Sequence, residues 1–201
     1  MLKFLFAALL ISGSPTPAPA PAATKPAAEL DAKAQTVFNR LEIPDWRTHG
    51  KEYQASFKKL APILANLAKA DKVTLFEGLP HPAWEHELLA AEAKRKDTEV
   101  QHVFKFYTPS QAVDAKLLQA IHPLLTKAIA HRGAKGCGGF HPDWSLRFYH
   151  DGVCTDIQLC FGCHEIRAFD GKEWVYCDLD KMDEVAKLLT PLRQKRPEKK
   201  T

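Results

Sequence analysis

Cys160, Cys163 and His164 stand at the spacing C-x-x-C-H in the last third of the chain. This spacing is the attachment signature of c-type haem, in which a histidine serves as an axial ligand of the iron. Met182 or another histidine could supply the second axial ligand. The motif therefore raises the hypothesis of an electron-transfer protein with haem c attached through Cys160 and Cys163.

A wider set of cysteines and histidines favours a metal site instead. Cys137 and His141 are four residues apart just before the C-x-x-C-H motif, and Cys177 follows it. Zn²⁺ takes mixed thiolate and imidazole ligands in a tetrahedral arrangement. Four of the following six side chains would complete such a zinc site: Cys137, His141, Cys160, Cys163, His164 and Cys177.

Disulfide bonds are an alternative use of the same cysteines. The chain has five of them, so at least one must stay free, bind a cofactor or pair between chains. The β-hairpins that the sequence predicts favour the bridges Cys163–Cys177 and Cys137–Cys160. Cys154 is then left as a small buried thiol. Metal binding and disulfide stapling stay open as alternatives at this point.

A thiol-dependent enzyme is a further alternative. A cysteine nucleophile would use His141 or His164 as its base, with Asp143 or Glu165 orienting that base. A thioredoxin-type C-x-x-C site would need its first cysteine at a helix N-terminus, whereas residues 164–169 alternate as in a strand. The spacing singles out no catalytic set, so the sequence favours a non-enzymatic domain.

Two Asp-Gly pairs predict the β-hairpins that must position these residues. Asp151-Gly152 and Asp170-Gly171 each separate two alternating runs, which is a strong hairpin signal. We expect a two-residue loop at each pair, which fixes the residues that face each other across the strands. The resulting cross-strand pairs are Arg147 with Asp156, Leu146 with Ile157, Ile166 with Val175, and His164 with Cys177.

The same hairpins predict one long middle strand over residues 153–169. A strand rises about 3.3 Å per residue and alternates its faces, so Cys160 and Cys163 would stand about 10 Å apart on opposite faces. Neither a haem nor a shared metal fits that geometry. A β-bulge at Gly162 would bend the strand and could bring Cys163 beside Cys177.

The remaining elements predict an α+β fold. We expect an antiparallel meander of about three C-terminal strands, joined by one or two earlier strands and packed against helices. Pro62 should interrupt one helix, Thr108 should cap another, and His122 and His131 should lie on helix surfaces. The predicted helices cover residues 29–41, 51–70, 83–95, a segment from 109, and 180–192, and the predicted earlier strands cover residues 73–76 and 102–107.

The first 20 residues have the pattern of a secretory signal peptide. One lysine precedes an apolar run over residues 4–11 that is too short to span a bilayer, and small residues follow it. A Pro/Ala-rich disordered linker (21–28), a single globular domain (29–192) and a basic disordered tail (193–201) complete the predicted organisation. We therefore expect an exported protein, periplasmic or extracellular, with no membrane span after cleavage.

The charge of the chain argues against nucleic acid as a partner. The formal net charge is only +4, and much of it lies in the C-terminal tail. A nucleic-acid-binding surface is usually more basic and carries aromatic side chains among its charges. The tail has no aromatic residue, so it is expected to be a solvated end.

Three short segments resemble landmarks of a family of exported proteins from environmental bacteria. They are "EGLPH" at residues 77–81, "GFHPDW" at 139–144 and "CFGCHE" at 160–165. The resemblance spans about residues 70–190 and brings no assigned activity. It implies that Gly78, His81 and the other two segments belong to one structural unit, in which His81 joins the candidate ligands.

Overall fold

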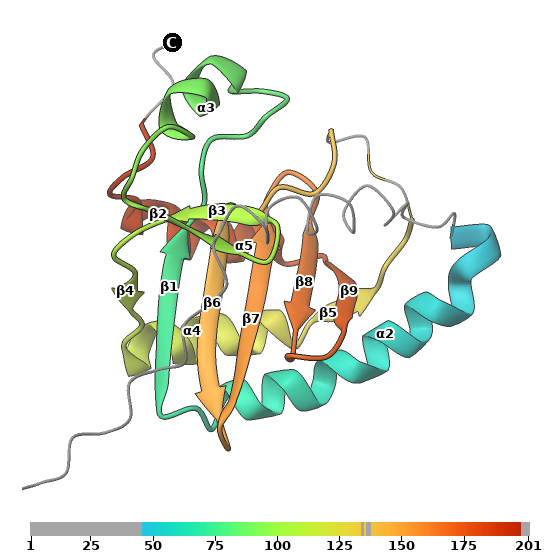
Figure 1. The fold of residues 1–201 in the computed structure, drawn as a ribbon. Helices are drawn as coiled ribbons and strands as arrows, with labels where there is room; N and C mark the ends of the chain where they lie inside the picture. The colour runs from blue at the N-terminus through green and yellow to red at the C-terminus, as the bar shows by residue number, and fades with distance from the viewer. Residues whose placement is uncertain (1–45, 134, 136–137, 198–201) are drawn as a thin grey trace, which may run out of the picture.

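The computed structural model describes residues 46–133, 135 and 138–197 (Figure 1). Within these residues it contains four α-helices, a seven-stranded sheet and a two-stranded sheet, which confirms the predicted α+β class. The predicted signal peptide, the linker and the helix at 29–41 lie outside the described residues. In chain order the elements are α2 (Trp46–Leu67), β1 (Lys72–Glu77), α3 (His86–Glu92), β2 (Thr98–Gln101), β3 (Phe104–Tyr107), β4 (Gln111–Ala112), α4 (Ala115–Leu125), β5 (Ala128–Ala130), β6 (Trp144–His150), β7 (Val153–Cys160), β8 (Glu165–Phe169), β9 (Trp174–Leu179), α5 (Met182–Leu189) and the 3₁₀-helix η1 (Thr190–Leu192).

The large sheet has the strand order β4-β1-β6-β7-β8-β9-β5, and all neighbouring strands are antiparallel. Helices α2, α4 and α5 lie on one face, and the β2–β3 hairpin crosses the other (Figure 1). Strands β6 to β9 form a continuous meander. This meander has one strand more than predicted.

The first predicted hairpin is confirmed in register. Strands β6 and β7 pair Arg147 with Asp156 and Leu146 with Ile157 on either side of the Asp151-Gly152 turn. Arg147 Nε also donates to Asp156 Oδ1 at 2.7 Å, so the opposite charges meet as expected.

The predicted long middle strand is wrong, because the chain reverses at Phe161–His164. Strand β7 ends at Cys160 and β8 begins at Glu165, and these two residues face each other. His164 takes a left-handed backbone with φ of 52°, and its N–H lies 3.3 Å from the Phe161 carbonyl oxygen. Histidine adopts this conformation more readily than most non-glycine residues, which lets a four-residue turn replace the expected bulge at Gly162.

The second hairpin is present, but its predicted register is wrong by two residues. Ile166 faces Cys177, and it is Ala168 that faces Val175. The cause lies in the loop, where Asp170 Oδ1 accepts the N–H groups of Lys172 and Glu173 at 3.0 and 3.2 Å. This side-chain turn extends the loop from the predicted two residues to four.

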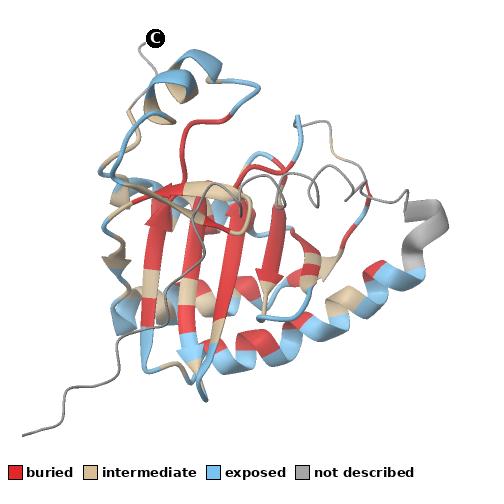
Figure 2. Ribbon diagram, in the orientation of Figure 1, coloured by how far each residue is buried: buried red, intermediate tan, exposed pale blue. Residues whose placement is uncertain are grey.

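Apolar side chains of the helices and the sheet form the main core (Figure 2). Pro62 does not split α2 as predicted; it lies on the exposed face, while the opposite face packs on the sheet. Tertiary packing of that face outweighs the one hydrogen bond that proline removes. The buried members include Leu60, Ile63, Leu64 and Leu67 of α2, Ile121 and Leu125 of α4, Met182, Val185 and Leu189 of α5, and Trp144, Leu146, Phe148, Ile157, Leu159, Ile166 and Cys177 of the sheet.

The caps of two helices differ from the prediction. Helix α4 starts six residues after Pro109, at Ala115, because Asp114 rather than Thr108 caps it. The Asp114 carboxylate accepts the Leu117 N–H at 2.7 Å. Helix α5 starts at Met182 and not at the predicted Asp180.

The sheet face opposite the helices is polar, although much of it is buried. Cross-strand neighbours on this face are Ser145, Gln158, Arg167 and Tyr176, one from each strand from β6 to β9. The first three are less than 5% exposed. Buried polar groups need partners, so this face depends on its hydrogen bonds in a way that the helix face does not.

Residues 193–197, which we name the C-terminal strap, pack against the domain. The prediction of a disordered tail is therefore wrong for this segment, and residues 198–201 lie outside the described part of the chain. Glu77 Oε2 accepts the N–H groups of Gln194 and Lys195 at 3.0 Å, and Oε1 accepts that of Arg196 at 2.9 Å. One carboxylate at the end of β1 thus binds three consecutive amides of the strap.

Gly78 lies where two chain segments come into direct backbone contact. Its N–H donates to the Asp143 carbonyl oxygen at 2.8 Å. A Cβ atom at this position would lie 2.0 Å from the Pro142 carbonyl oxygen. The glycine is therefore required by space and not by turn geometry.

Gly78→Ala should lower the free energy of unfolding by about 1–3 kcal/mol, because the methyl group displaces a backbone carbonyl. Chemical denaturation of the two proteins measures the difference. Gly162→Ala is the matched control, since a Cβ there meets nothing within 4 Å. Equal stability of the Gly78 and Gly162 variants would contradict the close approach.

Candidate functional site

The three landmark segments meet at one edge of the sheet, where β1 ends, β6 begins and the β7–β8 turn lies. Asp143 connects them. Its carbonyl oxygen accepts the Gly78 N–H, its N–H donates to the Leu159 carbonyl oxygen, and its Oδ2 accepts the Phe161 N–H at 2.8 Å. The three segments are therefore in direct contact through Asp143.

Cys160 is fully buried at the end of β7. The Cys163 N–H donates to its Sγ at 3.3 Å, and the His141 N–H donates to the same sulfur. Burial nevertheless raises the pKa of the Cys160 thiol to about 11. The two N–H groups would stabilise a thiolate, but without a cation beside it the sulfur stays protonated.

His81 and His141 lie side by side, with ring centroids 5.0 Å apart, and both are at least nine-tenths buried. Within the part of the chain that the structure describes, Nε2 of His81 and Nδ1 of His141 have no hydrogen-bond partner. The Ala83 N–H donates to Nδ1 of His81 at 3.0 Å, so in neutral His81 the proton sits on Nε2. Burial, helped by nearby His81 and Arg196, lowers the pKa of His141 to about 3 and keeps it neutral.

Two arginines of the C-terminal strap close this edge. Asp143 Oδ1 accepts from Arg193 Nη2 at 3.0 Å and from Arg196 Nη1 at 2.9 Å. Arg196 also pairs with Glu85, whose Oε2 accepts the His81 N–H at 2.8 Å. The histidine pair is therefore held from both sides by ion pairs.

Cys163 lies in a small apolar cluster with Cys160, Phe140 and Phe104. It is 4% exposed, and its Sγ lies 3.3 Å from the carbonyl oxygen of Gly139. The backbone at Gly139 therefore lies directly against the sulfur.

The structure divides the six predicted ligands. His141, Cys160 and Cys163 come together, and with His81 they form what we name the His–Cys cluster. Cys137 lies outside the described residues. His164 and Cys177 lie apart from this cluster.

Cys177 faces the opposite side of the sheet from the cluster, within the helix-side core. The predicted pairing of His164 with Cys177 fails because the four-residue Asp170 loop shifts β9 by two positions. Cys160 and Cys177 are both free thiols, as is Cys154. The predicted bridges Cys163–Cys177 and Cys137–Cys160 are therefore wrong.

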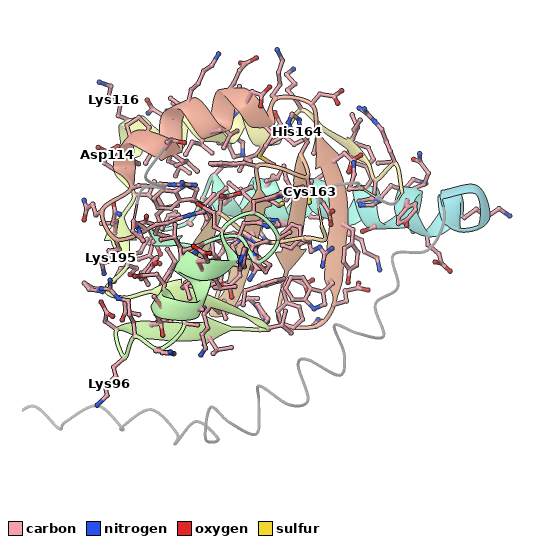
Figure 3. All side chains as sticks on the ribbon, turned by 90° about the horizontal axis from the view of Figure 1, so that it is seen from above. Lys96, Asp114, Lys116, Cys163, His164 and Lys195 are labelled. Carbon is pink, nitrogen blue, oxygen red and sulfur yellow. The ribbon has the colours of Figure 1, made fainter. Side chains whose placement is uncertain are left out.

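The C-x-x-C-H residues do not have the arrangement that a covalently attached haem needs. A haem held by both cysteines presents its iron to the histidine of the motif, so the three side chains must face one side. Cys163 points toward the middle of the molecule, whereas His164 lies toward α5 (Figure 3). His164 Nε2 is 3.4 Å from Asp183 Oδ1, and 45% of its side chain is exposed. The described residues thus do not fit haem c.

A preformed metal centre is also not seen in the part of the chain that the structure describes. Within it, no three His, Cys, Asp or Glu side chains are arranged to hold a metal ion. His81 is a poor ligand in its present orientation, because its unpartnered Nε2 carries the proton. His141 lies beside Cys160, whose sulfur accepts the His141 N–H.

The predicted orienting carboxylates serve other partners. Asp143 binds the strap arginines and the Phe161 N–H. Glu165 Oε1 accepts from Arg167 Nε at 2.7 Å, and Glu165 Oε2 lies 3.4 Å from Nε2 of His131. Neither carboxylate orients His141 or His164 as a catalytic base.

A second buried polar cluster, which the sequence did not indicate, surrounds His131. His131, expected on a helix surface, is 4% exposed, with Nε2 between Glu165 and Asp178 at 3.4 and 3.9 Å. The Gly133 N–H donates to its Nδ1 at 3.0 Å, so Nε2 carries the proton toward both carboxylates. Lys135 Nζ and Asp178 Oδ2 are 2.6 Å apart. No sequence pattern marks this cluster, since its members come from three separate strands or strand ends.

Comparison with family models, with curated proteins and with solved structures finds no match to this chain. In the described residues, no helix is both long enough and apolar enough to cross a membrane. Function is therefore inferred from the geometry of the site itself.

His141 should make stability fall as the solution is acidified. Its pKa is lowered in the folded protein to about 3, while the unfolded chain takes up the proton below about pH 6.5. The unfolded state then binds more protons, so between pH 6 and pH 4 the free energy of unfolding drops by about 2 kcal/mol from this residue.

Denaturation of wild type and His141→Asn at pH 6, 5 and 4 measures this contribution. The variant should lose less stability over the range, and the exposed control His164→Asn should follow the wild type. Parallel pH profiles for wild type and His141→Asn would contradict a buried neutral imidazole.

The free thiols should differ in reactivity. Cys154 is partly exposed, whereas burial raises the pKa values of Cys160 and Cys177 to about 11 and about 12. Iodoacetamide at pH 8 should alkylate Cys154 at least about tenfold faster than the other two, as followed by peptide mass spectrometry. If Cys160 instead reacts fastest, also in Cys154→Ser, the thiol-enzyme alternative is favoured.

Proposed function

We propose that the protein is an exported, non-enzymatic α+β domain whose His–Cys cluster is stapled by a disulfide between Cys163 and Cys137. The chain has five cysteines, and Cys154, Cys160 and Cys177 are free thiols. Five minus three leaves Cys163 and Cys137 as the available pair. The observation that carries the proposal is the 3.3 Å contact between Cys163 Sγ and the Gly139 carbonyl oxygen.

That contact supports the pairing by chain length. Gly139 is two residues after Cys137, and two residues span at most about 7 Å. The two Cα atoms of a disulfide stand roughly 4.4–6.8 Å apart. Cys137 is therefore within reach of Cys163, and the signal-peptide pattern supports a compartment where such a bond persists.

The staple would close a loop between Cys137 and Cys163. A loop of this length stabilises a domain by about 3.5 kcal/mol when its entropy in the unfolded chain is counted. It would fix Phe140 and His141 over the β7–β8 turn. The proposed role of the staple is structural. The raised pKa of the Cys160 thiol agrees with this role, because a protonated thiol is a poor nucleophile.

A second candidate is a zinc-binding domain, favoured by the unpartnered Nδ1 of His141 beside Cys160. Buried polar atoms without partners are uncommon and often mark a missing ion or water. Zinc would take this nitrogen and the sulfurs of Cys160 and Cys163, with Cys137 as a fourth donor. It would displace the thiol proton of Cys160. Because metal and staple both need Cys163, they are mutually exclusive.

Thiol counting under denaturing conditions separates these functions, with protein exported by a bacterial host and purified without reductant. The staple gives three free thiols in the wild type, two in Cys160→Ser and four in Cys163→Ser. A bridge between Cys160 and Cys163 would instead give four in Cys160→Ser. Peptide mass spectrometry should recover the cross-linked Cys137 and Cys163 peptides.

Elemental analysis and an absorption spectrum of the same sample complete the test. The proposal expects neither stoichiometric metal nor a Soret band. Five free thiols with one zinc per chain would replace it by the metal function. A Soret band that survives acid–acetone extraction would replace it by haem c.

A further inference from the structure

We propose that the cavity between η1 and the C-terminal strap is a binding site for a small oxyanion, of the phosphate or carboxylate class, held by Arg193 and Arg196. The site is separate from the staple and does not depend on it. The cavity has a volume of about 430 Å³, and its lining residues are Glu85, Thr190, Pro191, Arg193, Gln194, Arg196 and Pro197.

The two guanidinium groups are held close together by one oxygen atom. Arg193 Nη2 and Arg196 Nη1 both donate to Asp143 Oδ1, at 3.0 and 2.9 Å. The other oxygen of Asp143 binds the Phe161 N–H. Arg196 Nη2 also donates to Glu85 Oε2. A guanidinium carries five N–H donors in a planar fork, so these contacts still leave most of the donors of the pair unused.

The unused donors include buried ones. Among the described residues, Nε of Arg193 and Nε of Arg196 have no acceptor, and the Arg196 side chain is only 6% exposed. A buried N–H without an acceptor carries a desolvation cost that an incoming oxygen removes. The Nε and Nη groups of arginine suit two oxygens of one carboxylate or phosphate.

The neighbouring carboxylates do not fill this role. Glu77 is occupied by three strap amides. Although burial alone would raise the pKa of Glu85, the His81 N–H and Arg196 hold it below the ordinary value, so it is ionised and already paired. Burial and the adjacent Arg196 lower the pKa of Arg193. Asp143 Oδ1 already lies between the two cations and offsets part of that repulsion, so an incoming oxyanion would bind at the remaining guanidinium donors.

The strap is also positioned for ligand exchange at the surface. Its anchoring amides are bound to Glu77, so the arginine side chains keep their places when the cavity is empty. Figure 3 places Lys195 of the strap at the edge of the molecule, well away from Cys163. Glu85 of the cavity lining accepts the His81 N–H, so the oxyanion site adjoins the His–Cys cluster.

Isothermal titration of the mature protein with inorganic phosphate, and separately with acetate, tests the proposal against sodium chloride at matched ionic strength. Saturable one-to-one binding of at least one oxyanion is expected. Arg193→Gln should weaken it by about tenfold or more, as expected for loss of a charged hydrogen bond. Arg132→Gln, an exposed arginine outside the cavity, should bind like the wild type.

Gln194→Glu provides a second variant if Arg193→Gln fails to fold. It keeps the backbone amide on Glu77 and adds a negative charge to the cavity lining, so binding should be lost while the fold is kept. Phosphate binding without acetate binding would identify a tetrahedral anion, and the reverse a carboxylate. Absence of saturable binding, or equal affinity in Gln194→Glu and wild type, would overturn the proposal.

Discussion

The carboxylate of Asp143 is the interaction on which this edge of the protein depends. One oxygen fixes the start of the β7–β8 turn through the Phe161 N–H, and the other gathers Arg193 and Arg196. Its backbone binds both β1 and β7 through Gly78 and Leu159. Three strands and the strap are therefore joined at a single residue that is 9% exposed. Charge-assisted bonds of this kind gain strength from burial only while every partner stays in place.

The correct parts of the sequence prediction depend on local interactions along the chain. The Asp151-Gly152 turn determines its hairpin because a two-residue loop leaves no freedom in register. The α+β class followed from alternation in the C-terminal third and from helical spacing elsewhere. The meeting of Gly78, His81, His141 and the "CFGCHE" segment was also anticipated, although from a resemblance and not from spacing. The hairpin and the fold class depend on residues whose neighbours in sequence determine their geometry, whereas the meeting of the three segments does not.

The failures arise where a side chain or a distant segment changes the backbone. Asp170 lengthens its own loop by binding two amides, which moves Cys177 away from the motif. His164 accepts a left-handed backbone and turns the chain where a strand was expected. The strap could not be identified as ordered, since its anchor Glu77 is more than a hundred residues earlier. The His131 cluster was not predicted for the same reason, because its charged side chains come together only after the sheet has formed.

The bond between Glu77 and the strap links an early strand to nearly the last residues of the chain. Synthesis proceeds from the N-terminus, and domains generally assemble in that order. Until residues 193–196 have emerged, Asp143 and Glu85 are buried-site carboxylates without their cations, and Glu77 has no amides to bind. The edge that carries the His–Cys cluster is thus the last part of the domain to become complete. A chain that stops a few residues early would keep all the strands of the sheet and the backbone bonds of Asp143, but it would lack the strap arginines at this edge.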